Sequence, residues 1–133
     1  MRAKVLILGL IYLLMMSFIF SAKEESHFNF WQKFFTEPVE TIYIIMKNGT
    51  LFKYTNHEER LIHLCAGILE DTLKKRSYKI KDIAIIIHNH RIEQIFSDAD
   101  WRFYRDIKRR GLNGLFLLYC HRTNKTYCLE YKK

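Results

Sequence analysis

The sequence contains few of the residues that divide a chain into domains or tie it together. Its 133 residues include one proline, five glycines and three cysteines. It has no internal repeat, no low-complexity tract and no stretch with the composition of a linker. These absences, and the length that remains after an apolar N-terminus, limit the chain to one compact domain. No Cys-x-x-Cys pair is present, which argues against a zinc site made of cysteines.

The three cysteines, Cys65, Cys120 and Cys128, are an odd number, so at most one disulfide can form within the chain. Cys120 and Cys128 flank an expected turn and could face each other across a hairpin. Cys65 falls on the apolar face of an expected helix, where a buried and inert thiol is the usual explanation.

The first 22 residues have the order of a secretory signal. Two basic residues precede an apolar run at 5–20, and small residues come before a charged stretch that begins at Lys23. We expect residues 1–22 to be a signal peptide or an uncleaved membrane anchor, since the run is short for a span of about 20 residues and Phe20 fits the cleavage rule poorly. The charge asymmetry places the rest of the chain outside the cytoplasm, in the periplasm or secreted. Membrane contact is expected only through residues 5–20, if they are retained.

The formal net charge of +8 suits anionic surfaces in general. The basic residues are spread along the chain, however, and an exported protein rarely meets DNA. We therefore expect a solvated basic surface and no nucleic-acid partner.

After the signal, residues 23–39 carry five aromatic side chains and end near the only proline, Pro38. We expect this aromatic lead-in to pack on a domain formed by residues 40–133. In that domain, Asn-Gly at 48–49 separates two runs of β-branched and aromatic residues. This is a strong hairpin signal, since both turn positions need positive φ.

The remaining pattern alternates strands and helices. An apolar run after Asp82 is typical of a strand buried on both faces, at the centre of a sheet. The predicted elements are strands at 41–47 and 50–55, a helix at 57–75 with Asn56 as N-cap, the strand that ends in His88-Asn89-His90, a helix at 98–111 with Ser97 as N-cap, and strands at 114–121 and 127–131. The order β-β-α-β-α-β-β predicts an α/β sandwich around a mixed sheet, with the second helix crossing between two parallel strands.

The candidate site lies where the central strand ends. His88 and His90 are two residues apart, so their imidazoles point to the same face at the carboxyl end of the strand, where α/β sheets bind ligands. Asp100 follows in the first turn of the next helix, which must begin nearby. Two histidines and one carboxylate leave a fourth position on zinc for water, as in catalytic zinc sites. The plain alternative is that Ser97 and Asp100 form only a helix capping box.

His-x-His followed by Ser-x-x-Asp, between a hydrophobic strand and a helix, resembles the JAMM motif of the JAB/MPN zinc metalloprotease family. The resemblance is closest to its bacterial RadC-like branch, and it covers residues 40 to about 121. It implies a three-layer α/β/α sandwich of the cytidine-deaminase-like type. It also implies zinc on His88, His90 and Asp100, Glu40 as general acid/base, and Ser97 as a group that stabilises an oxyanion.

The resemblance further implies cleavage of an amide, peptide or isopeptide bond, with a peptide or isopeptide-linked protein as substrate. Arg91 stands where the family usually has proline, and the loop before Ser97 is shorter than in the family, which reshapes the rim of the site. A non-catalytic binding module with the same fold is the alternative function. A RadC-like association with DNA is disfavoured by the export segment.

Overall fold

The computed structural model describes residues 30–37, 39–55, 65–92 and 95–129; the predicted signal at 1–22 and the predicted cap Asn56 lie outside them. The chain has an α/β fold in which two α-helices pack on a five-stranded mixed sheet, in the predicted order β-β-α-β-α-β-β. The strands are β1 (Thr41–Met46), β2 (Leu51–Thr55), β3 (Ile83–His90), β4 (Leu115–Cys120) and β5 (Lys125–Cys128), and the helices are η1 (Phe30–Lys33), α2 (Ala66–Lys74), η3 (Ile80–Asp82) and α3 (Asp98–Arg109). In the described part of the chain, neither α-helix has the length and apolar composition that a membrane span requires.

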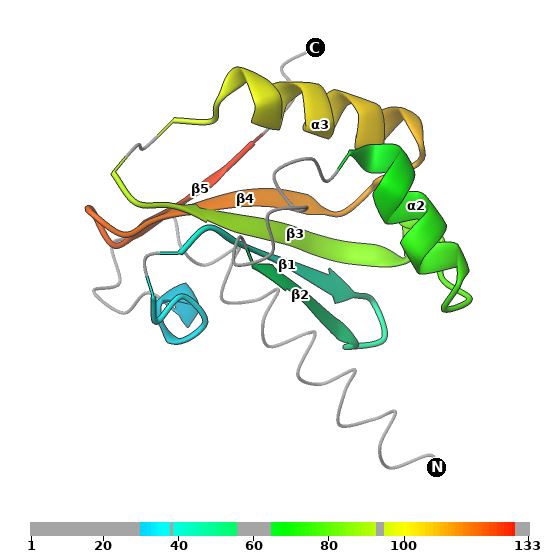
Figure 1. Ribbon diagram of the computed structural model, residues 1–133, viewed down its shortest axis with the longest axis horizontal. Helices are drawn as coiled ribbons and strands as arrows, with labels where there is room; N and C mark the ends of the chain where they lie inside the picture. The colour runs from blue at the N-terminus through cyan, green and yellow to red at the C-terminus, as the bar shows by residue number, and fades with distance from the viewer. Residues whose placement is uncertain (1–29, 38, 56–64, 93–94, 130–133) are drawn as a thin grey trace.

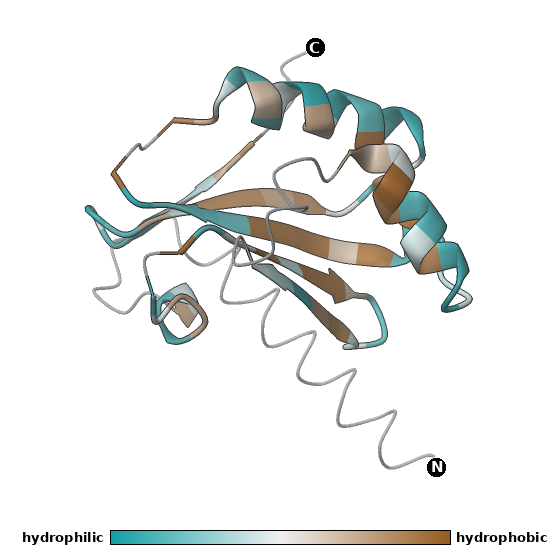
Figure 2. Cartoon of the chain, viewed as in Figure 1, coloured by the Kyte–Doolittle hydropathy of each residue, from teal (hydrophilic) through white to brown (hydrophobic). Residues whose placement is uncertain are grey.

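The strand order is β2-β1-β3-β4-β5, so β3 occupies the centre of the sheet, as its apolar run predicts (Figure 1). It pairs antiparallel with β1 and parallel with β4. The parallel pair is joined through α3, which confirms the predicted crossover. Figure 2 shows β3 hydrophobic over most of its length and hydrophilic toward its carboxyl end.

Both α-helices cover the same face of the sheet. Leu69 and Leu73 of α2 and Ile107 of α3 share one buried cluster with Ile44 and Ile86 of the sheet. On the opposite face, Trp31 and Phe35 of the aromatic lead-in pack against β1, β3 and β4, as expected. The described residues thus show helices on one face and the η1 segment on the other, and the three-layer sandwich that the resemblance implies stays a prediction.

The β1–β2 turn differs from the predicted one. The N–H of Gly49 donates to Met46 O at 2.9 Å, and the N–H of Met46 donates to Thr50 O at 2.8 Å. Gly49 has φ 87°, whereas Asn48 is not among the non-glycine residues of positive φ. The connection is therefore a three-residue loop with glycine alone in the left-handed region, because the first turn position can be right-handed when glycine supplies the reversal.

Two predictions about cysteines are wrong. Cys65 is exposed and has an extended backbone, φ −84° and ψ 159°, so α2 begins only at Ala66. Cys120 is buried and pairs with Lys125 across the final hairpin, whereas the exposed Cys128 pairs with Leu117. The register therefore separates Cys120 from Cys128, because β5 begins earlier than its apolar pattern indicates. None of the three cysteines, all of which lie in the described residues, is part of a disulfide.

Candidate metal centre

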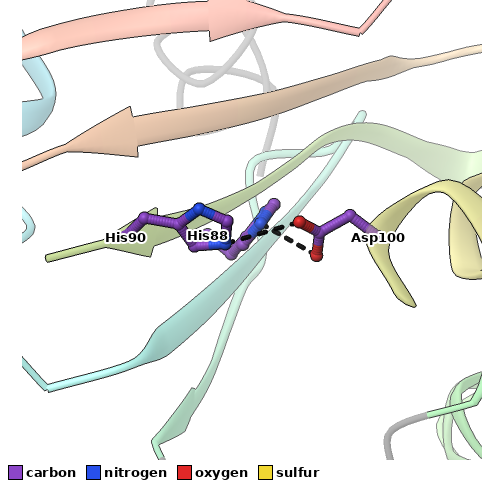
Figure 3. Close-up of side chains that lie close together, drawn as sticks. All are labelled: His88, His90 and Asp100. Atoms are coloured by element: carbon purple, nitrogen blue, oxygen red, sulfur yellow. Dashed lines mark ion pairs between the residues drawn. The ribbon is translucent and has the colours of Figure 1, made fainter. Parts of the chain in front are cut away.

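Three side chains meet at the carboxyl end of β3, on the helix-bearing face of the sheet. His88 and His90 come from the strand and Asp100 from the first turn of α3 (Figure 3). The Nε2 atom of His88 lies 3.1 Å from Asp100 Oδ1, and the Nε2 atom of His90 lies 3.4 Å from Asp100 Oδ2. Each residue offers a ligand atom, and these atoms lie within 4.8 Å of one another. The group that the sequence predicts is thus assembled and could hold a metal.

The local sequence explains this convergence. Side chains alternate across a strand, so residues 88 and 90 share a face while residue 89 points to the other. Ser97 begins α3 with a capping box: its N–H donates to Asp100 Oδ2 at 2.7 Å, and its Oγ accepts from the N–H of Asp100 at 3.1 Å. The capping box and the His-His-Asp group therefore coexist. The cap fixes the carboxylate through Oδ2 and leaves Oδ1 facing His88.

The charge state of Asp100 suits a residue that binds a metal cation. Its side chain is 16% exposed, and burial alone raises the pKa of this carboxyl. The imidazoles of His88 and His90 and the N–H of Ser97 lower the pKa by more, and the net effect holds it far below its ordinary value. Asp100 is therefore an anion at neutral pH, which is the form that binds a metal.

An observation on His88 tests whether these residues fit a metal. Its imidazole lies beside the rings of Phe96 and Phe116, and its ring centroid is 6.0 Å and 5.7 Å from theirs. Among the described residues its buried Nε2 finds no hydrogen-bond partner, although Asp100 Oδ1 is only 3.1 Å away. A buried nitrogen that is near a carboxylate but not aligned with it is expected where both atoms are aimed at a shared ion. Two nitrogens and one oxygen are the donor set of catalytic zinc sites, although they do not identify the metal.

Glu40 does not belong to the three-residue group. It is exposed and lies directly before β1. The register pairs Ile42 with His88, so Glu40, two residues earlier, lies near His90 at the end of β3. The structure places the backbone of Glu40 beside the site, and its catalytic role remains a prediction.

The structure also shows two polar residues that the sequence analysis did not select. Asn89, between the two histidines, is 3% exposed, and its Nδ2 lies 2.7 Å from Nε2 of His121. His121 directly follows β4 and is half-buried, and burial lowers its pKa. The sequence could have identified Asn89, because strand alternation puts its amide on the same buried face as Ile85 and Ile87. A buried amide must find hydrogen-bond partners.

No protein-family model matches the chain, and no curated protein or solved structure shows a significant similarity to it. The arrangement of His88, His90 and Asp100 therefore carries the functional argument.

Proposed function

We propose that this protein is a zinc-dependent hydrolase of the JAMM type that cleaves an amide, peptide or isopeptide bond outside the cytoplasm. The observation that carries the proposal is the convergence of His88, His90 and Asp100, whose ligand atoms lie within 4.8 Å of one another. Three protein ligands leave a position open for water and substrate, whereas structural zinc sites are closed by four.

When bound, zinc polarises a carbonyl and lowers the pKa of water at the open position. Glu40 takes the proton from the attacking water and passes it to the leaving amine. The hydroxyl of Ser97 accepts from the N–H of Asp100 in the cap, so its own hydrogen can be donated to the developing oxyanion. The β1–β3 register supports the role of Glu40, because it brings the residue to the strand end that carries the ligands.

The fold and location belong to the same proposal. We propose a JAB/MPN-like sandwich that resembles the RadC-like branch, and the β3-α3-β4 crossover with His88 and His90 at the carboxyl end of β3 supports it. We propose a peptide or isopeptide-linked protein as substrate, no nucleic-acid partner, and a periplasmic or secreted location directed by residues 1–22. Residues 5–20 are then the only membrane contact, if they are retained.

The first prediction tests the metal. The full chain, purified in mild detergent and supplied with zinc, should hold about one zinc per chain by elemental analysis. Asp100→Asn should weaken zinc binding on the order of 10-fold or more, because it removes the anionic ligand while an amide oxygen can still cap α3. Asp98→Asn is the matched control, since Asp98 is an exposed acid in the same turn of α3 and lies outside the three-residue group.

The proposed metal centre is wrong if the wild-type protein holds no zinc, or if the Asp98 and Asp100 variants hold equal amounts. The zinc-loaded chain is then incubated with fluorogenic peptide and isopeptide-linked substrates. Cleavage that stops on chelation and returns with zinc supports the hydrolase. Full zinc occupancy with no cleavage of any member of the panel points instead to the binding module.

A further inference from the structure

Asn89 uses its whole side chain to hold the segment that enters β1. Its Oδ1 accepts from the N–H of Thr41 at 2.7 Å, and its Nδ2 donates to Val39 O at 2.9 Å. Nδ2 also lies 2.7 Å from Nε2 of His121. Only one orientation of the amide satisfies these contacts, since Thr41 offers a donor and Val39 an acceptor. An NH₂ group only donates, so Nε2 of His121 accepts and its proton resides on Nδ1.

The hydrogen bonds of Asn89 hold the residues on both sides of Glu40. Val39 and Thr41 flank Glu40, and both are held from β3 by a side chain that is itself buried. Thr41 Oγ1 also donates to Val39 O at 3.0 Å, which tightens the same short segment. With its two neighbours anchored, the backbone of Glu40 has little freedom to move. A group held in this way is preorganised, so little ordering remains to be done during a reaction.

The geometry also connects the anchor to the metal ligands. Asn89 is the residue between His88 and His90, and strand alternation sends its side chain to the opposite face of the sheet. The same short piece of β3 therefore presents two ligands on one face and holds the backbone of Glu40 from the other. The N–H of His121 donates to the carbonyl of His90 at 3.0 Å, which ties the chain after β4 to the end of β3.

We propose that Asn89 is a positioning residue that holds Glu40 beside the His88-His90-Asp100 centre. The inference rests on the proposed function, because it takes Glu40 to be the acid/base. The side chain of Asn89 points to the face of the sheet opposite the His88-His90-Asp100 centre. Its effect passes through the backbone of residues 39–41, so it should disappear when the carboxylate of Glu40 is absent.

The test uses the full chain loaded with cobalt(II), whose visible absorption changes as the water completing its coordination ionises. A nearby carboxylate disfavours that ionisation, so Glu40→Gln should lower the pH midpoint of the absorption change by about one unit or more. Asn89→Leu should lower the midpoint in the same direction by freeing Glu40. In the Glu40→Gln background, Asn89→Leu should have no further effect, which is the signature of one residue acting through another.

Ile87→Ala is the control for loss of packing, because Ile87 is buried on the same face of the same strand and is not bonded to residues 39–41. It should lower thermal stability and leave the midpoint unchanged. Asn89→Ser, which is too short to span Val39 and Thr41, serves if Asn89→Leu does not fold.

The outcomes separate the two proposals. A wild-type chain that binds neither cobalt nor zinc overturns the proposed function and this inference together, and so does a Glu40→Gln variant with the wild-type midpoint. The inference alone is overturned if the chain binds cobalt and Glu40→Gln shifts the pH midpoint, but Asn89→Leu keeps the wild-type midpoint. It is also overturned if the shifts of Asn89→Leu and Glu40→Gln simply add in the double variant.

Discussion

At the scale of one residue, Asp100 belongs both to the capping box of α3 and to the group that could hold a metal. Its Oδ2 accepts from the N–H of Ser97, which is ordinary helix capping, and its Oδ1 faces His88. The sequence left capping box and metal site as alternatives because each explains Ser-x-x-Asp by itself. The structure combines the capping box with the His-His-Asp group that could hold a metal, since one carboxylate has enough lone pairs for both.

Ser97→Ala should separate the cap from the site. Loss of the cap should lower the free energy of unfolding of the metal-free chain by about 1 kcal/mol. The carboxylate of Asp100 is then less well oriented, so zinc affinity should also fall on the order of 10-fold, as for other groups that orient a ligand. Chemical denaturation and metal titration measure the two effects. Ser97→Thr retains a capping oxygen and should keep both values near wild type; if Ser97→Ala costs stability with no loss of affinity, the cap does not serve the site.

Glu40→Gln should separate catalysis from metal binding. Glutamine keeps the size of the side chain and cannot act as a general base, so the rate of hydrolysis should fall on the order of 10²-fold or more while zinc content stays near one per chain. Glu37→Gln is the matched control, because Glu37 is also exposed and lies only three residues before Glu40. Hydrolysis at the wild-type rate in Glu40→Gln would remove this residue from the mechanism.

At the scale of the element, both α-helices end at a residue with positive φ, which reverses the direction of the backbone. After α3, Gly111 has φ 104°, and the N–H of Leu112 donates to Ile107 O at 3.0 Å. After α2, Ser77 occupies the corresponding position with φ 63°, and the N–H of Tyr78 donates to Leu73 O at 2.9 Å. Both helices thus end in a Schellman motif, but only α3 has the glycine that this motif favours.

Ser77→Gly should therefore stabilise the protein. Glycine adopts positive φ without the steric cost that serine bears there, so the free energy of unfolding should rise by a few tenths to about 1 kcal/mol. Gly111→Ala is the reciprocal change and should lower it by about 1 kcal/mol, for the same reason with opposite sign. Thermal or denaturant unfolding measures both. A less stable Ser77→Gly variant would show that the serine side chain contributes more than its backbone strain costs.

The whole molecule has a predicted orientation relative to a membrane. The basic residues before the apolar run at 5–20 and the acidic residues after it should direct the domain across. A reporter active only outside the cytoplasm, fused after Lys133, should therefore be active. A fusion that lacks residues 1–22 is the control and should be inactive. If this reporter is inactive on the full chain, while a reporter active only in the cytoplasm is active at the same position, the topology is reversed and the extracytoplasmic part of the proposed function is removed.

At this scale too, the predicted elements agree with the structure where the signals are local. The central strand, the crossover helix and the cap at Ser97 were predicted because apolar periodicity and capping depend on neighbours in the sequence. The conformation of Cys65 and the partners of Cys120 and Cys128 were mispredicted, because a helix start and a strand register depend on what packs against them.

The sequence by itself determined the order of the elements and the three candidate ligands, because the periods of strand and helix and the short spacing from His88 to Asp100 leave little freedom. Only the tertiary structure decided which strand lies beside β3 and which face the helices cover. The pairing of β1 with β3 brings residues 48 positions apart, Thr41 and Asn89, into hydrogen-bond contact. Such a contact depends on the burial and pairing of the whole sheet, which local patterns do not encode. It is this pairing that brings Glu40 to the end of the histidine strand.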